Sequence, residues 1–214
     1  MTLPLITQDM IALAPGDELI LRYRTWDDYE NLLSRRQNKA GLKIRYSSAT
    51  QEIRIMSPLP GHGKNVDILA DLVKALLRYQ GQDWEAFTPI TLKLTNQQGV
   101  EPDYCFYLQN RQRILGKERL DLEIDPPPDL LIEVDLTSTT TPEAYQAIAP
   151  SELWIYRRSN LLIYHFDKQQ YQESQTSYHF PDFDVKKLIP KYVERGWQVG
   201  SSVAVREFEA FLQS

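Results

Sequence analysis

Two apolar, strand-like runs near the middle of the chain carry carboxylates. They are "GVEPDYCFY" at residues 99–107 and "PPPDLLIEVDLTS" at residues 126–138. A buried carboxylate is costly unless it is paired with a cation, hydrogen-bonded or bound to a metal. Any fold of this chain must therefore bring partners for these acids into its core.

The second run predicts a strand that lies in the interior of a sheet. Its apolar residues are nearly continuous, which is typical of a strand covered on both faces. Glu133 and Asp135 are two residues apart, so in a strand they share one face. Asp103 begins the other strand and follows Pro102. If the two strands are neighbours, the three carboxylates can converge on one point.

Two interpretations of these acids remain open at this stage. Three carboxylates that converge repel one another unless a cation is present. A site with only oxygen ligands suits a hard ion such as Mg²⁺ or Mn²⁺. Alternatively, the acids are structural: Pro-Asp is typical of a turn or cap, Glu133 could pair with an arginine, and Asp135 could cap the next turn.

The rest of the chain alternates between helical and strand periodicities. Hairpins are expected over residues 42–58 and 152–174, and strands over 84–94 and 102–108. Helices are expected over residues 25–37, 62–80 and 141–149, and twice within 184–213. This order predicts a single α/β or α+β domain over residues 1–214, with a mixed sheet flanked by helices. Its core would span residues of about 20–180.

Composition limits the classes of protein that fit. The 214 residues are 42% hydrophobic, which suits one sizeable core. The net charge of −5 argues against a protein that coats nucleic acid by bulk charge. A single cysteine, Cys105, fits a reducing compartment. No secretory signal is evident, and no apolar run reaches the roughly 18 residues of a membrane span. We therefore expect a cytoplasmic protein with no membrane partner.

The order and spacing of the motifs resemble a known family. "EPDYCFY", then "PPDLLIEVDLTS" and "AYQAIAPSELWIYRRSNLLIYHF", are similar to the bacterial Uma-two family of putative restriction endonucleases. The earlier "IRIMSPLPGHGKNVDIL" fits the start of that family. The resemblance implies the restriction-endonuclease-like fold of the PD-(D/E)xK superfamily. It also implies Mg²⁺- or Mn²⁺-dependent hydrolysis of DNA phosphodiester bonds.

By position, the resemblance makes Asp103 and Glu133 the metal-binding and catalytic acids. Asp135 is a further candidate ligand, but it stands where the superfamily has its lysine. Lysine is also absent from the next segment, "TSTTTPEAYQAIAPSE", where many relatives place it. Lys93 and Lys64 are the candidates to replace it.

His62 and Glu101 complete the expected pocket, although His62 could equally be a loop or cap residue. The missing lysine leaves two hypotheses for function. One is a metal-dependent DNA endonuclease, for which a homodimer is plausible because a two-stranded cut needs two sites. The other is a catalytically inactive member of the fold that binds nucleic acid or metal.

Overall fold

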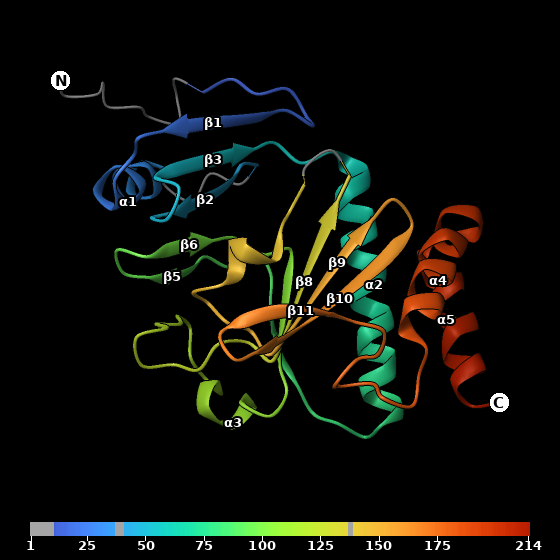
Figure 1. Ribbon diagram of the computed structural model, residues 1–214. Helices are drawn as coiled ribbons and strands as arrows, with labels where there is room; N and C mark the ends of the chain where they lie inside the picture. Colours follow the sequence, from blue (N-terminus) through green and yellow to red (C-terminus); the bar gives the residue numbers. More distant parts are fainter. Residues whose placement is uncertain (1–10, 37–40, 137–138) are drawn as a thin grey trace.

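The strands in the described part of this protein form two sheets, where a single mixed sheet was expected (Figure 1). The computed structural model describes residues 11–36, 41–136 and 139–214. The expectation that no secretory signal is present concerns residues 1–18, of which residues 1–10 lie outside the described part. The mixed α+β class is confirmed, with the sheets covered by helices.

The smaller sheet has five strands, and all its pairs are antiparallel. In spatial order they are β1 (Glu18–Arg22), β3 (Glu52–Met56), β2 (Lys43–Ser47), β6 (Gln98–Val100) and β5 (Leu92–Leu94). Helix α1 (Trp26–Arg35) lies within the helix expected over residues 25–37 and begins with a capping box between Thr25 and Asp28. Its buried Tyr29 and Leu32 pack against the apolar face of β2 and β3.

The larger sheet has six strands. In spatial order they are β11 (Gln170–Ser174), β10 (Asn160–Asp167), β9 (Glu152–Arg157), β8 (Leu130–Asp135), β7 (Tyr104–Tyr107) and β4 (Glu85–Phe87). Only the β8–β9 pair of this sheet is parallel among the described residues. All six residues of β8 are buried in the middle of the sheet, which confirms the prediction from its apolar run.

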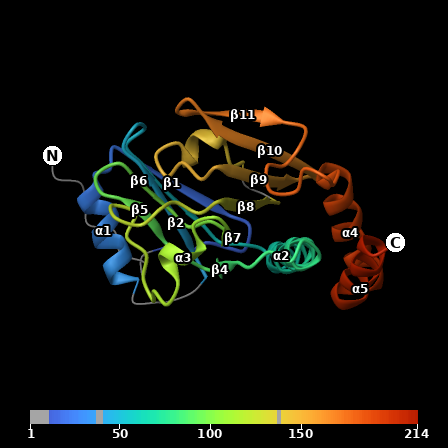
Figure 2. The ribbon, with the colours of Figure 1, turned by 90° about the horizontal axis from the view of Figure 1, so that it is seen from below.

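One face of the larger sheet is covered by the long helix α2 (Pro60–Tyr79). Leu69, Leu72 and Leu76 belong to the same core as Ile132 and Val134 of β8. Helices α4 (Val185–Val199) and α5 (Ser201–Leu212) pack beside α2, as both ribbon views show (Figures 1 and 2). Within the described ranges no helix is long and apolar enough to cross a membrane.

The other face of the larger sheet turns toward the smaller one. Leu131 of β8 packs there with Leu92, Val100 and Tyr145. Tyr145 ends the short 3₁₀ helix η2 (Pro142–Tyr145), which replaces the longer helix expected over 141–149. Because Glu133 alternates with Ile132 and Val134, it faces this intersheet side. The carboxylates therefore point between the sheets.

Two segments that looked like single strands are divided between the sheets. Residues 84–94 give β4 in the larger sheet and β5 in the smaller one, with Pro89 between them. Proline cannot donate to a strand ladder, so the pairing changes there. Likewise the chain passes from β6 to β7. A four-residue helix, α3 (Arg111–Ile114), follows in the charged connection.

The junction between α1 and the smaller sheet generates the first prediction. A Cβ added to Gly99 of β6 would overlap the ring and hydroxyl of Tyr29, which is fully buried. Gly99→Ala should therefore lower the free energy of unfolding by about 1–3 kcal/mol, the usual cost of overpacking a core. Urea denaturation measures this difference.

Gly63→Ala is the matched control, because a Cβ at Gly63 has open space around it. Alanine is favoured over glycine in a helix by about 1 kcal/mol. The control should therefore be neutral or stabilising. Equal stability of the two variants would contradict the packing that we describe between Tyr29 and Gly99.

Candidate active site

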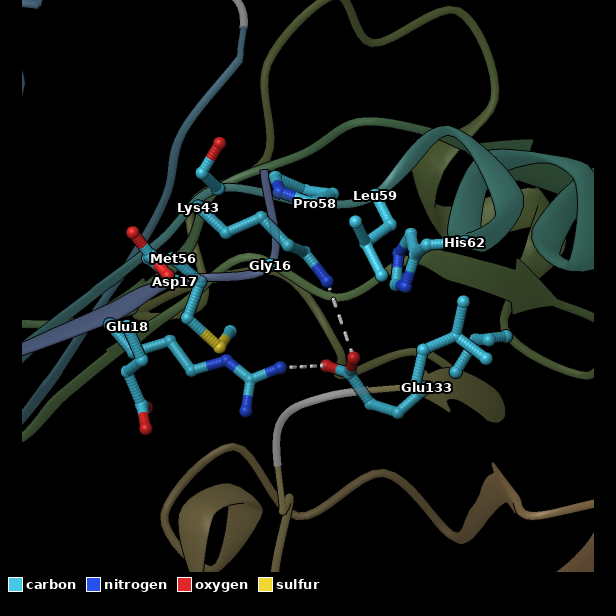
Figure 3. A pocket seen from close by; sticks show the side chains of 13 residues that line it. Gly16, Asp17, Glu18, Lys43, Met56, Pro58, Leu59, His62 and Glu133 are labelled. Carbon is cyan, nitrogen blue, oxygen red and sulfur yellow. Dashed lines mark hydrogen bonds and ion pairs between the residues drawn. The ribbon is translucent and has the colours of Figure 1, made fainter. Parts of the chain in front are cut away.

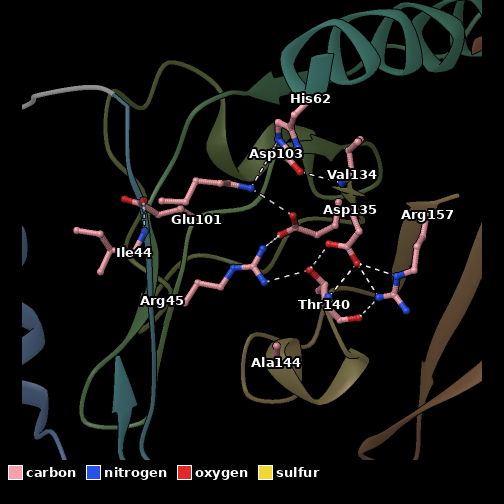
Figure 4. Close-up of polar contacts among 12 residues, drawn as sticks. Ile44, Arg45, His62, Glu101, Asp103, Val134, Asp135, Thr140, Ala144 and Arg157 are labelled. Carbon is pink, nitrogen blue, oxygen red and sulfur yellow. Dashed lines mark hydrogen bonds and ion pairs between the residues drawn. The ribbon is translucent and has the colours of Figure 1, made fainter. Parts of the chain in front are cut away.

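The candidate site is built on the three-residue crossover that links β6 to β7. Both of its acids, Glu101 and Asp103, are buried. Glu101 Oε2 accepts the backbone N–H of Ile44 in β2 at 2.8 Å. Asp103 Oδ2 accepts the backbone N–H of Val134 in β8 at 2.8 Å. Each carboxylate thus accepts a backbone N–H from a neighbouring strand, at the point where that strand's hydrogen bonding to β6 or β7 ends (Figure 4).

Asp103 and Glu133 converge on one cation. The ammonium of Lys43 donates to Asp103 Oδ1 at 2.7 Å and to Glu133 Oε2 at 3.3 Å. Figure 3 shows Lys43 reaching from the smaller sheet toward Glu133. Asp103 directly precedes β7, which is the neighbour of β8 that carries Glu133, because Tyr104 pairs with Ile132. The convergence that the sequence predicted is therefore present.

Two further basic side chains contact the acid pair. Arg45 Nη2 donates to Glu133 Oε1 at 2.7 Å, so Glu133 does pair with an arginine. His62 Nε2, in the first turn of α2, lies 2.6 Å from Asp103 Oδ1. The neighbourhood thus combines groups from both sheets and a helix.

The pKa values of Glu133 and Asp103 are shifted in opposite directions by this environment. Burial raises the pKa of Glu133 above its usual value despite the attraction of Arg45 and Lys43, and the charge on Asp103 adds to the rise. For Asp103, burial acts in the same direction. There, however, the attraction of Lys43 and the contact with His62 outweigh it, so the pKa of Asp103 is lowered. Asp103 therefore has the lower pKa of the two acids.

Asp135 does not join this pair, which corrects the expectation of three converging acids. Arg157 lies directly opposite Asp135 on the parallel strand β9 and donates to its Oδ2 from Nε at 3.0 Å and from Nη2 at 2.6 Å. The backbone N–H and the hydroxyl of Thr140 each donate to Asp135 at 2.8 Å. Asp135 thus links the end of β8 to Thr140 and to β9. The described residues include no group of three or more His, Cys, Asp or Glu side chains that could hold a metal.

Glu101 ties the smaller sheet together. Its Oε1 accepts from Arg36 after α1 and from the hydroxyl of Thr91 at 2.9 Å. Together with the Ile44 contact, these bonds use both carboxylate oxygens. Glu101 lies two residues before Asp103, but its hydrogen bonds stabilise the smaller sheet.

The two lysines proposed from sequence point to other partners. Lys93 Nζ lies 2.9 Å from Glu30 on α1. The ammonium of Lys64 lies 4.0 Å from the centroid of the Trp197 ring. Sequence reasoning missed Lys43 and Arg45. The alternation in "KIRYS" places them together on the face opposite Ile44, but nothing local shows that this face meets β8.

Cys105 and the remaining histidines are read as structural. Cys105 is fully buried beside Phe87, and burial raises the pKa of its thiol to about 12. His165 stacks on Tyr178 and faces Glu152. His179 bonds the carbonyl of Asp129.

The donor set at Asp103 and Glu133 fits a hard divalent cation. Their carboxylates come from two strands and already surround one positive charge, the Lys43 ammonium. Mg²⁺ is commonly held by one or two carboxylates with water completing its octahedron. The pocket beside the pair is lined by Lys43, Arg45, His62 and Glu133 (Figure 3).

Comparison with known proteins gives a family and a structural neighbour. No curated protein matches the chain. A crystal structure described as a "putative nuclease belonging to DUF820 from Anabaena variabilis ATCC 29413" superposes with a TM-score of 0.48 and 13% sequence identity. The match covers 72% of this chain and 86% of that one. The model of the Uma2 family, described as "Putative restriction endonuclease", matches residues 26–199. The chain therefore belongs to the Uma2 family.

Proposed function

We propose that this protein is a metal-dependent endonuclease that hydrolyses phosphodiester bonds in DNA. One observation carries the proposal: Asp103 and Glu133, from neighbouring strands, converge on the ammonium of Lys43 at the edge of an open pocket. Membership of a family described as restriction endonucleases supports it. So does burial, because ionisable groups gathered at a pocket are typical of functional sites.

The side chains of the site have different roles in this reaction. Asp103 and Glu133 supply oxygen ligands for Mg²⁺ or Mn²⁺. When bound, such an ion polarises a phosphoryl oxygen and lowers the pKa of water. Lys43 stabilises the negative charge that develops on the phosphate oxygens as water attacks phosphorus and the P–O ester bond breaks. His62 holds Asp103 in place from α2. A phosphomonoester and a free hydroxyl result.

Lys43 takes the part that sequence reasoning gave to Lys93 or Lys64. It reaches the acids from β2 of the smaller sheet, not from β8. Its side chain is only 14% exposed, so its charge acts in a poorly hydrated environment. Electrostatic interactions are stronger there than in water.

A second function is favoured by the charge balance at the same place. Lys43 and Arg45 already neutralise the acid pair without a metal. A divalent ion must therefore displace the Lys43 ammonium from between the carboxylates. If displacement is unfavourable, the protein is a non-catalytic module that binds nucleic acid through the same fold.

The metal ligands can be tested by thermal stability. Binding to the native state alone should raise the melting temperature as Mg²⁺ or Mn²⁺ is added, following the mass-action relation for a ligand. Asp103→Asn should lose this response, measured against its own metal-free melting temperature. Asp71→Asn is the matched control on the surface of α2, where Asp71 pairs with Lys74. The same metal-induced rise in wild type and Asp103→Asn would place the ion elsewhere.

The role of Lys43 can be tested by cleavage of supercoiled plasmid with Mn²⁺. Lys43→Ala should lower the rate by about 10²–10³, the usual effect of removing one preorganised electrostatic donor. Its metal-induced rise in melting temperature should persist, because the carboxylates remain. Lys93→Ala and Lys64→Ala should cut like the wild type.

Three outcomes would count against parts of this proposal. Equal rates for Lys43→Ala and wild type would refute the role of Lys43. A larger loss of cleavage rate in Lys93→Ala than in Lys43→Ala would assign the catalytic role to Lys93 instead of Lys43. Failure of the wild type to cut, with metal binding intact, would favour the non-catalytic module.

A further inference from the structure

An apolar rim borders the pocket of the acid pair on the side of α2. It consists of Leu136 after β8, Gly61 in the first turn of α2 and Trp197 near the end of α4. A Cβ built on Gly61 would lie 3.5 Å from Cη2 of Trp197 and 3.8 Å from Cδ1 of Leu136, so both side chains lie beside Gly61. Leu136 also lines the pocket that contains Glu133. The rim therefore runs from this pocket to the Trp197 ring.

The indole of Trp197 is held in place although about half of the residue is exposed. Of the four tryptophans, all within the described residues, Trp197 alone is among the exposed large hydrophobic residues, at 52%. Its Nε1–H donates to Asn65 Oδ1 at 2.7 Å, which fixes the ring against α2. Lys64 Nζ lies 4.0 Å from the ring centroid, on one face. A ring that is already ordered can bind a partner at little further cost in side-chain entropy.

The charges beside the ring favour an apolar contact over a contact with an anion. Lys64 lies over the ring, and Glu194 lies one turn before Trp197 on α4, so a positive and a negative charge flank it. Flat aromatic groups stack on one another in offset or edge-on arrangements. The exposed part of the indole therefore suits the face of an aromatic ligand better than a phosphate.

We propose that Trp197 stacks against an unpaired base of the DNA strand held at the acid pair. The proposal rests on the proposed nuclease function, because that function places a DNA strand in the pocket that the rim borders. Every base has a flat π-face, so stacking on an aromatic side chain tolerates any sequence. Bases inside a duplex are already stacked, and extruding one costs energy. The substrate class is therefore DNA with unpaired bases beside the cut.

Binding of DNA can be measured separately from cleavage. The probe is a fluorescein-labelled single-stranded oligonucleotide, and its fluorescence anisotropy is followed in EDTA so that no metal-dependent cutting occurs. Trp197→Leu should weaken binding about tenfold, a typical loss for one stacked base. The slope of log affinity against log salt should stay the same, because no phosphate contact is lost.

Two further variants separate stacking from a folding defect. Trp197→Phe loses the bond to Asn65 but keeps an aromatic face, so it should retain most of the binding that Trp197→Leu loses. Tyr79→Leu is the matched control, because Tyr79 is 54% exposed and lies at the opposite end of α2 from Gly61. It should bind the oligonucleotide like the wild type.

Two further probes test whether the ring contacts a base. A strand of the same length built of abasic sites keeps every phosphate but has no base to stack. A fully paired duplex of the same sequence has bases, but none is unpaired. Wild type and Trp197→Leu should bind the abasic strand equally, and they should also bind the duplex equally.

The stacking surface and the nuclease activity fail in different ways. The stacking surface is overturned if the wild type does not bind the single strand, if Trp197→Leu binds it equally, or if the loss is the same on the abasic strand. A wild-type dimer that Trp197→Leu abolishes in sedimentation would also overturn it, because a second copy would then cover the ring. A base-dependent loss in a protein that cuts no plasmid would support stacking and refute the nuclease activity alone.

Discussion

The structure depends on the way in which one short crossover satisfies backbone donors in two sheets. Glu101 and Asp103 flank a proline, and each carboxylate accepts an N–H from a different strand, one in β2 and the other in β8. These bonds fix the distance between the sheets at this point. The bond from Ile44 to Glu101 fixes the position of β2, and the neighbouring residue Lys43 can therefore donate to Asp103. Glu101 and Asp103, which are costly to bury in an apolar run, thus connect the smaller sheet to the larger one.

Electrostatics at this joint are nearly balanced. The acid pair faces Lys43, Arg45 and His62, and each carboxylate oxygen has a hydrogen-bond donor. Such a network is stable only while it is complete, because one lost partner leaves a charge uncompensated in the interior. The same completeness means that a divalent ion, as the proposed function requires, could enter only by moving an existing cation. Under that proposal, stability and metal affinity would compete at this site.

Local patterns predicted the elements better than their arrangement. The helical periodicity of α1 and α2 and the buried run of β8 are properties of consecutive residues, and each was predicted correctly. The separation into two sheets was not, because strand pairing is set by distant partners. Asp103 and Glu133 were found because each lies within a marked motif. Lys43 was not, since its approach depends on how the smaller sheet faces β8.

The pair formed by Asp135 and Arg157 carries a consequence for how this sequence can change. The two residues face each other directly across the parallel strands, with Asp135 almost fully buried. A lysine at position 135, as the superfamily pattern has it, would set two cations against each other in the interior. A single substitution of Asp135 by lysine is therefore destabilising, and each of the two positions limits which residue the other can hold.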